Sequence, residues 1–292
     1  MYELIQTGDK SYYINCPAKI GIYLADDNQV YLIDSGNNKD AGKKVFKILE
    51  QQSWQLKGIL NTHSHADHIG GNRYLQEQTG CKIFSGGMET AFIQYPNLEA
   101  TFLFGGYPCN DLRHKSLLAQ SSQTVDFSDP DFPKEVDILP LPGHSLDMVG
   151  FRTPDETLFL GDCISSAQTL EKYGIVFLFD IEAQLRTLDL VEELESPMFV
   201  PSHAEASPDI RELVCLNRSK IYETADKIRD ICKEPLTFES ILQRIFQRYN
   251  LTMTFEQYVL VGSTVRSYLA WLKDKGSITV EPKDNLLLWQ HI

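Results

Sequence analysis

The sequence lacks any long apolar segment. No stretch of its 292 residues approaches the roughly 18 consecutive apolar residues that a membrane-spanning helix needs. The first ten residues, MYELIQTGDK, include acidic side chains and no apolar run of signal-peptide length. We therefore expect a cytoplasmic protein that has no membrane partner.

Cysteine is sparse and shows no motif. The cysteines form no CxxC pair and no short-range framework that would indicate structural zinc or a disulfide scaffold. A chain of this length can bury a core without such crosslinks. We expect reduced thiols that fill small spaces in the interior. The six are Cys16, Cys81, Cys109, Cys163, Cys215 and Cys232.

Positive charge is also in short supply. The 27 lysines and arginines face 40 aspartates and glutamates, which gives a net charge of −13. A whole-chain nucleic-acid binder usually has a basic surface, so that class is disfavoured. The imbalance lies in the first 204 residues, because residues 205–292 hold 12 basic and 12 acidic side chains. This shift predicts an acidic domain at 1–205 and a neutral domain at 206–292.

Short apolar runs alternate with helical patterns through the first two thirds of the chain. In the predicted helix 40–52, for example, Val45, Ile48 and Leu49 recur at helical spacing. The alternation of strands and helices is typical of a layered α/β fold. The predicted strands are 30–36, 58–63, 81–84, 136–145, the hairpin 149–153 with 157–162, and 196–205, and the other predicted helix is 72–80.

Residues 85–133 interrupt this rhythm. They hold four glycines, four prolines and the aromatic-rich stretch ATFLFGGYP at 100–108. A long insert of weak periodicity is commonly a functional loop. We predict an irregular insert whose Phe102, Phe104 and Tyr107 cap a substrate site. The alternative is a surface excursion that covers its own small apolar cluster.

The last 87 residues read as helices. Ser207, Pro208 and Asp209 have the pattern of a helix start, and the helix they open is predicted to run to about residue 233. Two more helices are predicted at 237–249 and 254–274. The runs SITVEP and LLLWQ then predict a terminal hairpin. This order suggests a small winged-helix-like domain.

Histidine is the scarcest titratable residue besides cysteine, yet three of the seven histidines fall in six residues of NTHSHADHIGG at 61–71. Imidazoles and a carboxylate this close repel one another unless they share a cation. Three further candidates follow predicted strands, where side chains from neighbouring strands converge. The seven candidate ligands are His63, His65, Asp67, His68, His144, Asp162 and His203.

Spacing divides these side chains into two sets. His63 and His65 lie two residues apart and can reach one ion together with His144. The other set comprises Asp67, His68 and His203, with Asp162 bridging the two ions. Imidazole and carboxylate ligands suit Zn²⁺, Fe or Mn²⁺, with zinc as the default. The two remaining histidines, in the insert and at the last turn, are taken as surface residues.

The motif THSHADHIGG, followed by PGHS, LGD and PSH, resembles the metallo-β-lactamase fold superfamily over about residues 1–205. Among its members the motif looks most like hydroxyacylglutathione hydrolases. The resemblance implies a four-layer αββα sandwich that holds two metal ions. It also implies that Asp34, in LIDSG, supports the ligands without binding metal, as an alternative to a simple turn-forming aspartate. Lactamases proper place a cysteine near the bridging position, so Cys163 is an alternative ligand to Asp162.

The implied activity is hydrolysis of a small ester or thioester by hydroxide that bridges the two cations. Asp67 is the candidate catalytic residue, as a ligand or as a hydrogen-bond acceptor. The helical tail also resembles that of lactamase-like endoribonucleases, which makes RNA or another phosphodiester the first alternative. Iron-dependent oxidation, as in persulfide dioxygenases, and a non-enzymatic regulator are further alternatives. The sequence leaves the oligomeric state open, a homodimer included.

Overall fold

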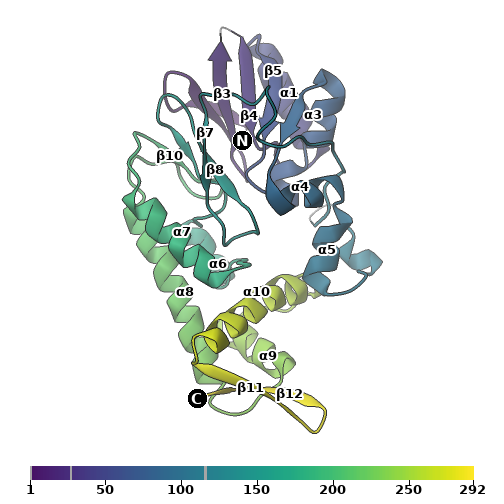
Figure 1. Ribbon diagram of the computed structural model, residues 1–292, viewed down its shortest axis with the longest axis vertical. Helices are drawn as coiled ribbons and strands as arrows, with labels where there is room; N and C mark the ends of the chain where they lie inside the picture. Colours follow the sequence, from purple (N-terminus) through teal and green to yellow (C-terminus); the bar gives the residue numbers. More distant parts are fainter. Residues whose placement is uncertain (1, 27, 115–116) are drawn as a thin grey trace.

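The computed structural model describes residues 2–26, 28–114 and 117–292. Two β-sheets lie face to face in one half of the molecule, and the C-terminal helices and hairpin extend from the other end (Figure 1). Within the described ranges, no helix has both the length and the apolar character needed to cross a membrane.

The first sheet has its six strands in chain order. The first four strands pair antiparallel, whereas β5 lies parallel to both β4 and β6. The three N-terminal strands were not predicted, because their sequences alternate only weakly between apolar and polar residues. The strands are β1 (Glu3–Gln6), β2 (Ser11–Asn15), β3 (Ile20–Asp26), β4 (Gln29–Ile33), β5 (Gln55–Leu60) and β6 (Lys82–Phe84).

The second sheet has the order β10-β9-β8-β7. The predicted hairpin is present as β8 and β9, which pair antiparallel, and β10 lies parallel to β9. Its strands are β7 (Asp137–Pro140), β8 (Val149–Arg152), β9 (Leu158–Phe159) and β10 (Phe199–Val200). The predicted strands of this sheet that end in a candidate ligand are therefore present but shorter than predicted.

Alternating side chains on the strands build the layers. In β3, Ile20 and Ile22 point to an outer core, and Tyr23 points to the core between the sheets. In β9, Leu158 faces the opposite outer core and Phe159 faces the inner one. Each sheet is thus buried on both faces, as a sandwich of two sheets between two helical layers requires. The predicted four-layer αββα arrangement is confirmed.

Helices cover the two outer faces. On the first sheet lie α1 and α3. Asn38 caps the N-terminus of α1, and its side chain accepts hydrogen bonds from two backbone N–H groups of the first turn. On the second sheet lie α7 and α8 (Arg211–Ile231), and α6 packs beside α8. Neither α6 nor α7 was predicted. The helices of this half are α1 (Lys39–Gln51), α2 (Ala66–Ile69), α3 (Asn72–Thr79), α6 (Ala167–Tyr173) and α7 (Ile181–Glu193).

The insert is more regular than predicted. It contains the helices α4 (Gly87–Gln94) and α5 (Asn97–Phe104) and the short 3₁₀ helix η1 (Asn110–Leu112). Apolar side chains lie all around both α helices rather than along one face, which is why their sequence periodicity is weak. Both helices bury side chains, since α4 packs beside α5, and α5 contacts the C-terminal helix α10 (Phe255–Asp274).

The C-terminal segment contains the predicted helices and hairpin. The first helix starts later than predicted, at Arg211, because Ser207 is still held to Phe199 by two backbone hydrogen bonds of 2.9 and 3.0 Å. Asp209 instead accepts a hydrogen bond from the Arg211 N–H at 3.0 Å. The elements are α8 (Arg211–Ile231), α9 (Phe238–Arg248), α10 (Phe255–Asp274), β11 (Ile278–Lys283) and β12 (Leu286–His291).

One core joins the second sheet to the C-terminal helices. Leu158 of β9, Leu188 of α7, Ile221 of α8 and Leu269 of α10 belong to a single contiguous cluster of buried side chains. The outer layer of the sandwich is therefore also the wall against which the C-terminal segment folds. The domain boundary near residue 205 remains a prediction, and this shared core supplies a test.

We predict that Leu269→Ala destabilises the sandwich and the C-terminal segment together. Leu269 is completely buried, so its truncation should lower the free energy of unfolding by about 2–5 kcal/mol. Denaturant unfolding is followed in two variants that retain a single tryptophan, either Trp54 beside the first sheet or Trp271 in α10. Both midpoints should fall equally. A shift confined to the Trp271 signal would instead establish an independent domain, and Leu216→Ala, on the exposed face of α8, is the control.

Candidate metal centre

The candidate ligands meet at one rim of the sandwich, where strands of both sheets end. Strand β5 leads into the segment 61–71, whose last ligands belong to the one-turn helix α2. Strands β7, β9 and β10 of the second sheet each lead to one further candidate. In chain order these are His144, Asp162 and His203.

Backbone hydrogen bonds fix the loops of this rim. The N–H of Val149, at the start of β8, donates to the carbonyl of Thr62 at 2.9 Å and so joins the two sheets beside the histidine motif. The N–H of Ser202 donates to the carbonyl of Gly161 at 3.0 Å, which holds the segments before His203 and Asp162 side by side.

Two glycines let the motif turn back against the first sheet. A Cβ atom at Gly70 would lie 2.3 Å from the carbonyl carbon of Asn37, and one at Gly71 would lie 2.3 Å from the carbonyl oxygen of Ser35. No side chain fits at such distances from backbone atoms. The pair that ends the motif HADHIGG is therefore required by close backbone approach.

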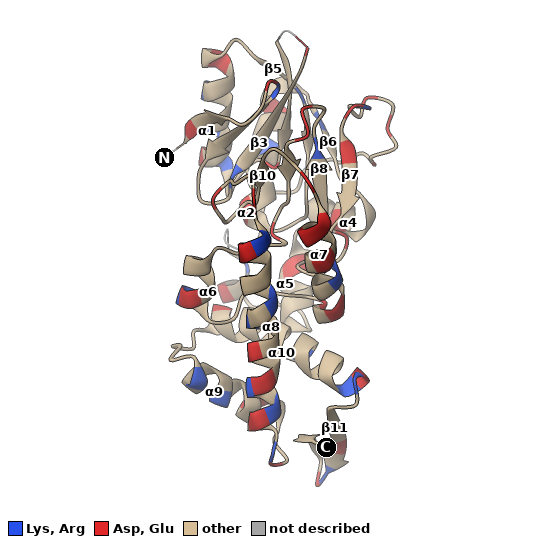
Figure 2. Cartoon of the chain, turned by 90° about the vertical axis from the view of Figure 1, so that its left-hand side faces the viewer, with Lys and Arg blue, Asp and Glu red and all other residues tan. Residues whose placement is uncertain are grey.

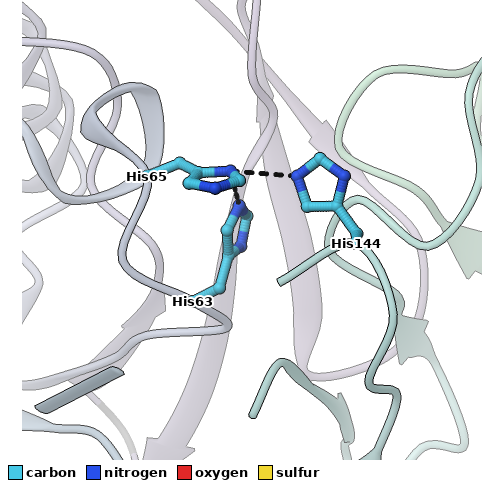
Figure 3. A group of neighbouring side chains, drawn as sticks. All are labelled: His63, His65 and His144. Atoms are coloured by element: carbon cyan, nitrogen blue, oxygen red, sulfur yellow. Dashed lines mark hydrogen bonds between the residues drawn. The ribbon is translucent and has the colours of Figure 1, made fainter. Parts of the chain in front are cut away.

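His63, His65 and His144 form the first group (Figure 3). The Nδ1 atom of His65 lies 3.0 Å from Nε2 of His63 and 2.9 Å from Nε2 of His144. Their rings are almost perpendicular, with interplanar angles of 82° and 75°. Three ring nitrogens therefore point into one small volume.

Hydrogen bonds on the far side of two rings fix where their protons lie. The Thr62 hydroxyl donates to Asp34 Oδ2 at 2.7 Å, so it accepts from Nδ1 of His63 at 2.9 Å. Nδ1 of His144 donates to the carbonyl of Phe177 at 3.1 Å. Both rings in their neutral form consequently present an Nε2 lone pair to the centre.

The first group therefore has fewer protons than it has close contacts between ring nitrogens. His65 can place one proton between its own Nδ1 and the two neighbouring lone pairs, so one close contact between nitrogens stays unbridged. Burial lowers the pKa of His65 to about 4 and that of His144 to about 3, and it also lowers the pKa of His63. Protonation does not relieve the repulsion near neutral pH. A cation that accepts all three lone pairs does.

Asp67, His68 and His203 form the second group. Nε2 of His203 lies 3.2 Å from Asp67 Oδ2, and Nε2 of His68 lies 3.7 Å from the same oxygen. Asp162 raises the pKa of His203 to about 10. Burial disfavours charge on His68, but Asp162, Asp67 and Asp34 outweigh it and raise its pKa. The carboxylates thus stabilise positive charge at this position.

Asp162 lies between the two groups. Its Oδ1 is 3.2 Å from His68 Nε2, and its Oδ2 is 3.3 Å from His203 Nε2 and 3.5 Å from His144 Nε2. Burial alone would raise its pKa, but His203 and His68 hold the pKa well below its usual range. The carboxylate is therefore ionised and faces ring nitrogens of both groups.

Asp34 supports the motif without facing the centre. It follows β4 in a left-handed backbone conformation, with φ of 63°. Its Oδ1 accepts from the Thr62 N–H at 2.9 Å, and its Oδ2 accepts from His68 Nδ1 at 2.8 Å. His68 therefore presents Nε2 to the centre, as a metal ligand held by a carboxylate normally does.

The residues present fit a metal site. Among the described residues, His68 Nε2 and Asp162 Oδ1 are buried and make no hydrogen bond, although they lie 3.2 Å apart and both face the centre. Buried polar atoms without partners are costly, and coordination would satisfy them. Neutral imidazole and carboxylate are the donors that Zn²⁺, Fe and Mn²⁺ accept. The His and Asp groups at this rim can therefore bind metal.

Cys163 is placed differently. It is buried in the core that the second sheet shares with the C-terminal helices, and burial raises the pKa of its thiol. It belongs to no ligand group formed by described residues. The geometry therefore favours Asp162 over Cys163 as the ligand at the end of β9.

A cavity of about 400 Å³ opens beside the two groups. His65 and Asp67 form one side of it, and Leu117, Phe177 and Leu260 supply apolar surface. Since Leu260 belongs to α10, the C-terminal segment contributes to the same cavity as the candidate ligands. Its volume is in the range of small-molecule sites.

The three aromatic residues predicted as a cap lie outside this cavity. Phe102 contacts Phe179 with ring centroids 5.2 Å apart, and Phe104 contacts Phe255 of α10 at 6.2 Å. Tyr107 is 78% exposed. None of the three predicted residues lines the cavity, and the insert contributes Glu99 and Leu117 instead.

Two site residues were missed from the sequence. Glu89 of α4 accepts hydrogen bonds from both ligand loops, and Glu99 of α5 has an oxygen 3.8 Å from His65 Nε2. Burial raises the pKa of Glu99 to about 8. Neither belongs to a recognisable motif, and only their position in an insert between ligand segments was a signal.

The two remaining histidines lie away from the ligand groups. Nε2 of His114 is 3.9 Å from Glu256 of α10, and His291 ends β12. They share no group with the seven ligands among the residues described.

Comparison with known proteins agrees with this arrangement. Residues 21–203 match the family model described as metallo-beta-lactamase superfamily. A hydroxyacylglutathione hydrolase from Hyphomonas neptunium is 33% identical over 146 residues, which cover 50% of this chain and 46% of that protein. A probable metallo-hydrolase, YybB, from Bacillus subtilis is 24% identical over 66% of this chain and 84% of its own length. The chain spans about half the length of the hydroxyacylglutathione hydrolases it matches.

Solved structures share the fold over nearly the whole chain. A beta-lactamase domain protein from Burkholderia ambifaria has a TM-score of 0.75 at 16% identity and covers 99% of this chain and 94% of its own. A metallo-beta-lactamase family protein from Thermus thermophilus has a TM-score of 0.71 at 16% identity, with coverage of 97% and 99%. The fold that these proteins share thus includes the C-terminal helices. By the match of its residues 21–203, this chain belongs to the metallo-beta-lactamase superfamily.

Proposed function

We propose that the protein is a metal-dependent hydrolase that holds two divalent cations and cleaves a small ester or thioester. The observation that carries this proposal is the first ligand group. Three ring nitrogens face one another at 2.9 and 3.0 Å with room for one proton, beside a cavity of small-molecule size. Two relatives that are named hydrolases support the same reaction class.

The candidate ligands fall into two sets, one for each cation. His63, His65 and His144 would hold one cation, while Asp67, His68 and His203 would hold the other, with Asp162 shared. When bound, such cations supply a water molecule of lowered pKa and polarise the carbonyl oxygen. Zinc is the proposed metal because it has high affinity for this donor set, with Fe or Mn as alternatives.

Asp67 has a role beyond holding a cation. Its side chain is 44% exposed and lines the cavity, whereas that of Asp162 is only 10% exposed. It can therefore accept a hydrogen bond from a water molecule or from substrate while it contacts His203. We propose Asp67 as the residue that orients the attacking water.

The cavity favours a compact acyl group. Its apolar side is formed by Leu117, Phe177 and Leu260, from three separate segments that close around the ligand rim. Such a site can bury an acyl chain and leave the carbonyl at His65 and Asp67. A small substrate is consistent with this volume of about 400 Å³.

Cleavage of RNA or another phosphodiester has less support. On α8, Arg218 contacts Asp189 and Glu192, and Lys220 and Lys227 both contact Glu223. Figure 2 shows acidic and basic residues side by side along this helix. The basic groups are thus neutralised locally and form no continuous basic face for a phosphate backbone on α8.

We predict that purified protein hydrolyses short-chain thioesters or esters and loses this activity when a chelator removes the metal. Added Zn²⁺ or Mn²⁺ should restore it, because the histidine groups remain folded around the site. The assay compares a thioester panel with single-stranded RNA and follows ions per chain by elemental analysis. Chelator-sensitive cleavage of RNA alone, one iron per chain with oxidation of a persulfide, or no reaction at all would each contradict the proposal.

We predict that Asp162→Asn lowers kcat by at least about 100-fold. Mutation of a residue that only supports a metal ligand already lowers metal affinity or activity by about 10- to 100-fold. The substitution removes the charge that faces both groups and keeps the shape. Its matched control is Cys163→Ala, one residue further on, which should keep the activity and the metal content. Loss of metal in the Cys163 variant, with metal retained in Asp162→Asn, would assign the ligand to the thiolate.

We predict that Leu260→Trp raises KM for the best thioester by about tenfold, the effect expected of one group in an apolar pocket. The larger ring would fill part of the cavity from α10 without touching a ligand. Metal content should stay at the wild-type value. Leu190→Trp, on the exposed face of α7, controls for the added indole. An unchanged KM in the Leu260 variant would place the substrate outside this cavity.

A further inference from the structure

Glu89 is a buried carboxylate that belongs to neither ligand group. It lies on α4, in the insert, and only 2% of its surface is exposed. Its Oε2 accepts a hydrogen bond from the Ser64 N–H at 2.9 Å. Its Oε1 accepts from the Ser145 hydroxyl and from the Asp147 N–H, the latter at 3.1 Å.

The donors to Glu89 lie close in sequence to the histidines of the first group. Ser64 lies between His63 and His65, and Ser145 follows His144 directly. One carboxylate therefore binds both loops that carry the three histidines of the first group. These loops come from different sheets and are 79 residues apart at the His65–His144 contact.

The backbone of the insert also donates a hydrogen bond to the loop that carries His144. The residue before α4 is Gly86, which has no side chain to cap the helix, and the Met88 N–H donates instead to Asp147 Oδ2 at 2.7 Å. Gly87 permits this approach, since a Cβ there would lie 2.3 Å from that oxygen and its φ is +56°. Glu89 thus accepts a hydrogen bond from the backbone of Asp147, and Asp147 accepts one from the backbone of Met88, the residue before Glu89.

We propose that Glu89 is a positioning residue that sets the spacing of His63, His65 and His144, so that the insert controls the metal affinity of this group. The inference rests on the two-ion site of the proposed function. It assigns the insert a role in building the centre, in place of the aromatic cap predicted from its composition.

The chemistry of the three donors explains why a carboxylate is required. An ionised carboxylate only accepts hydrogen bonds, and both of its oxygens meet donors here. In Glu89→Gln one of these oxygens becomes an NH₂ group that faces an N–H or hydroxyl donor. One loop must then move away, and the 2.9 Å separation between His65 Nδ1 and His144 Nε2 changes with it.

The test is a metal titration of metal-free protein, with Zn²⁺ in competition with a chromophoric chelator. Wild-type protein should bind two ions in resolvable steps. Glu89→Gln should weaken one step by about 10- to 100-fold, the cost of losing a group that supports metal ligands, and leave the other within a factor of a few. The visible absorption of bound Co²⁺ should change for the weakened site. Glu77→Gln, which removes an exposed carboxylate paired with Arg73 on α3, should change neither.

A second variant keeps the test decisive if Glu89→Gln fails to fold. Ser145→Ala leaves Glu89 in place and removes one of its three donors, so it should weaken the same step by a smaller factor. In the double variant the losses should be less than additive, because both act through one contact. Unchanged binding in folded Glu89→Gln and in Ser145→Ala would overturn the inference. Absence of metal binding in wild-type protein would instead refute the proposed function.

Discussion

The centre of this protein depends on a shortage of protons. His63 and His144 each commit their Nδ1 proton to an acceptor behind the ring, and so present lone pairs to His65 at 3.0 and 2.9 Å. Burial keeps all three rings neutral, so lone pairs remain in contact unless a cation joins them. The close contact of these lone pairs is unfavourable without a cation, so the surrounding structure must hold the three rings in place. A preorganised metal site generally needs such support.

Two buried carboxylates support the ligand segments from different parts of the fold. Asp34, behind the first sheet's motif, binds Thr62 and His68 and so orients the rings of both ligand groups. Glu89, from the insert, binds the loops on either side of the sandwich. Each accepts hydrogen bonds from the ligand segments, and neither belongs to a ligand group among the described residues. Strand pairing alone brings the loops to one rim, and these carboxylates fix their final separation and ring orientation.

The segments outside the sandwich also serve the site. The C-terminal helices share a core with the second sheet, and α10 carries Leu260 to the wall of the cavity. The insert packs between α10 and the ligand loops and contributes Leu117 to a small cluster with Val259. The elements that looked most like additions to a catalytic domain therefore complete its cavity. This position favours a role of the C-terminal segment with a small substrate, whereas the charges on α8 give little support for nucleic acid.

The fold class and the set of candidate ligands could be predicted from the sequence. The spacing of HxHxDH and the placing of His144, Asp162 and His203 after apolar strands predicted a shared rim, because strand ends in a layered sheet converge whatever their separation in sequence. The alternation of strands and helices predicted a layered α/β fold, and the resemblance to the metallo-β-lactamase superfamily implied the αββα layers. What only the tertiary structure decided was which atoms meet: that His65 turns Nδ1 to the centre, that Glu89 binds two loops, and that Leu260 rather than Phe102 lines the cavity. Local patterns encode which residues are neighbours along one element. Contacts between elements depend on register, helix start and rotamer, which are set by long-range burial that no short stretch of sequence contains.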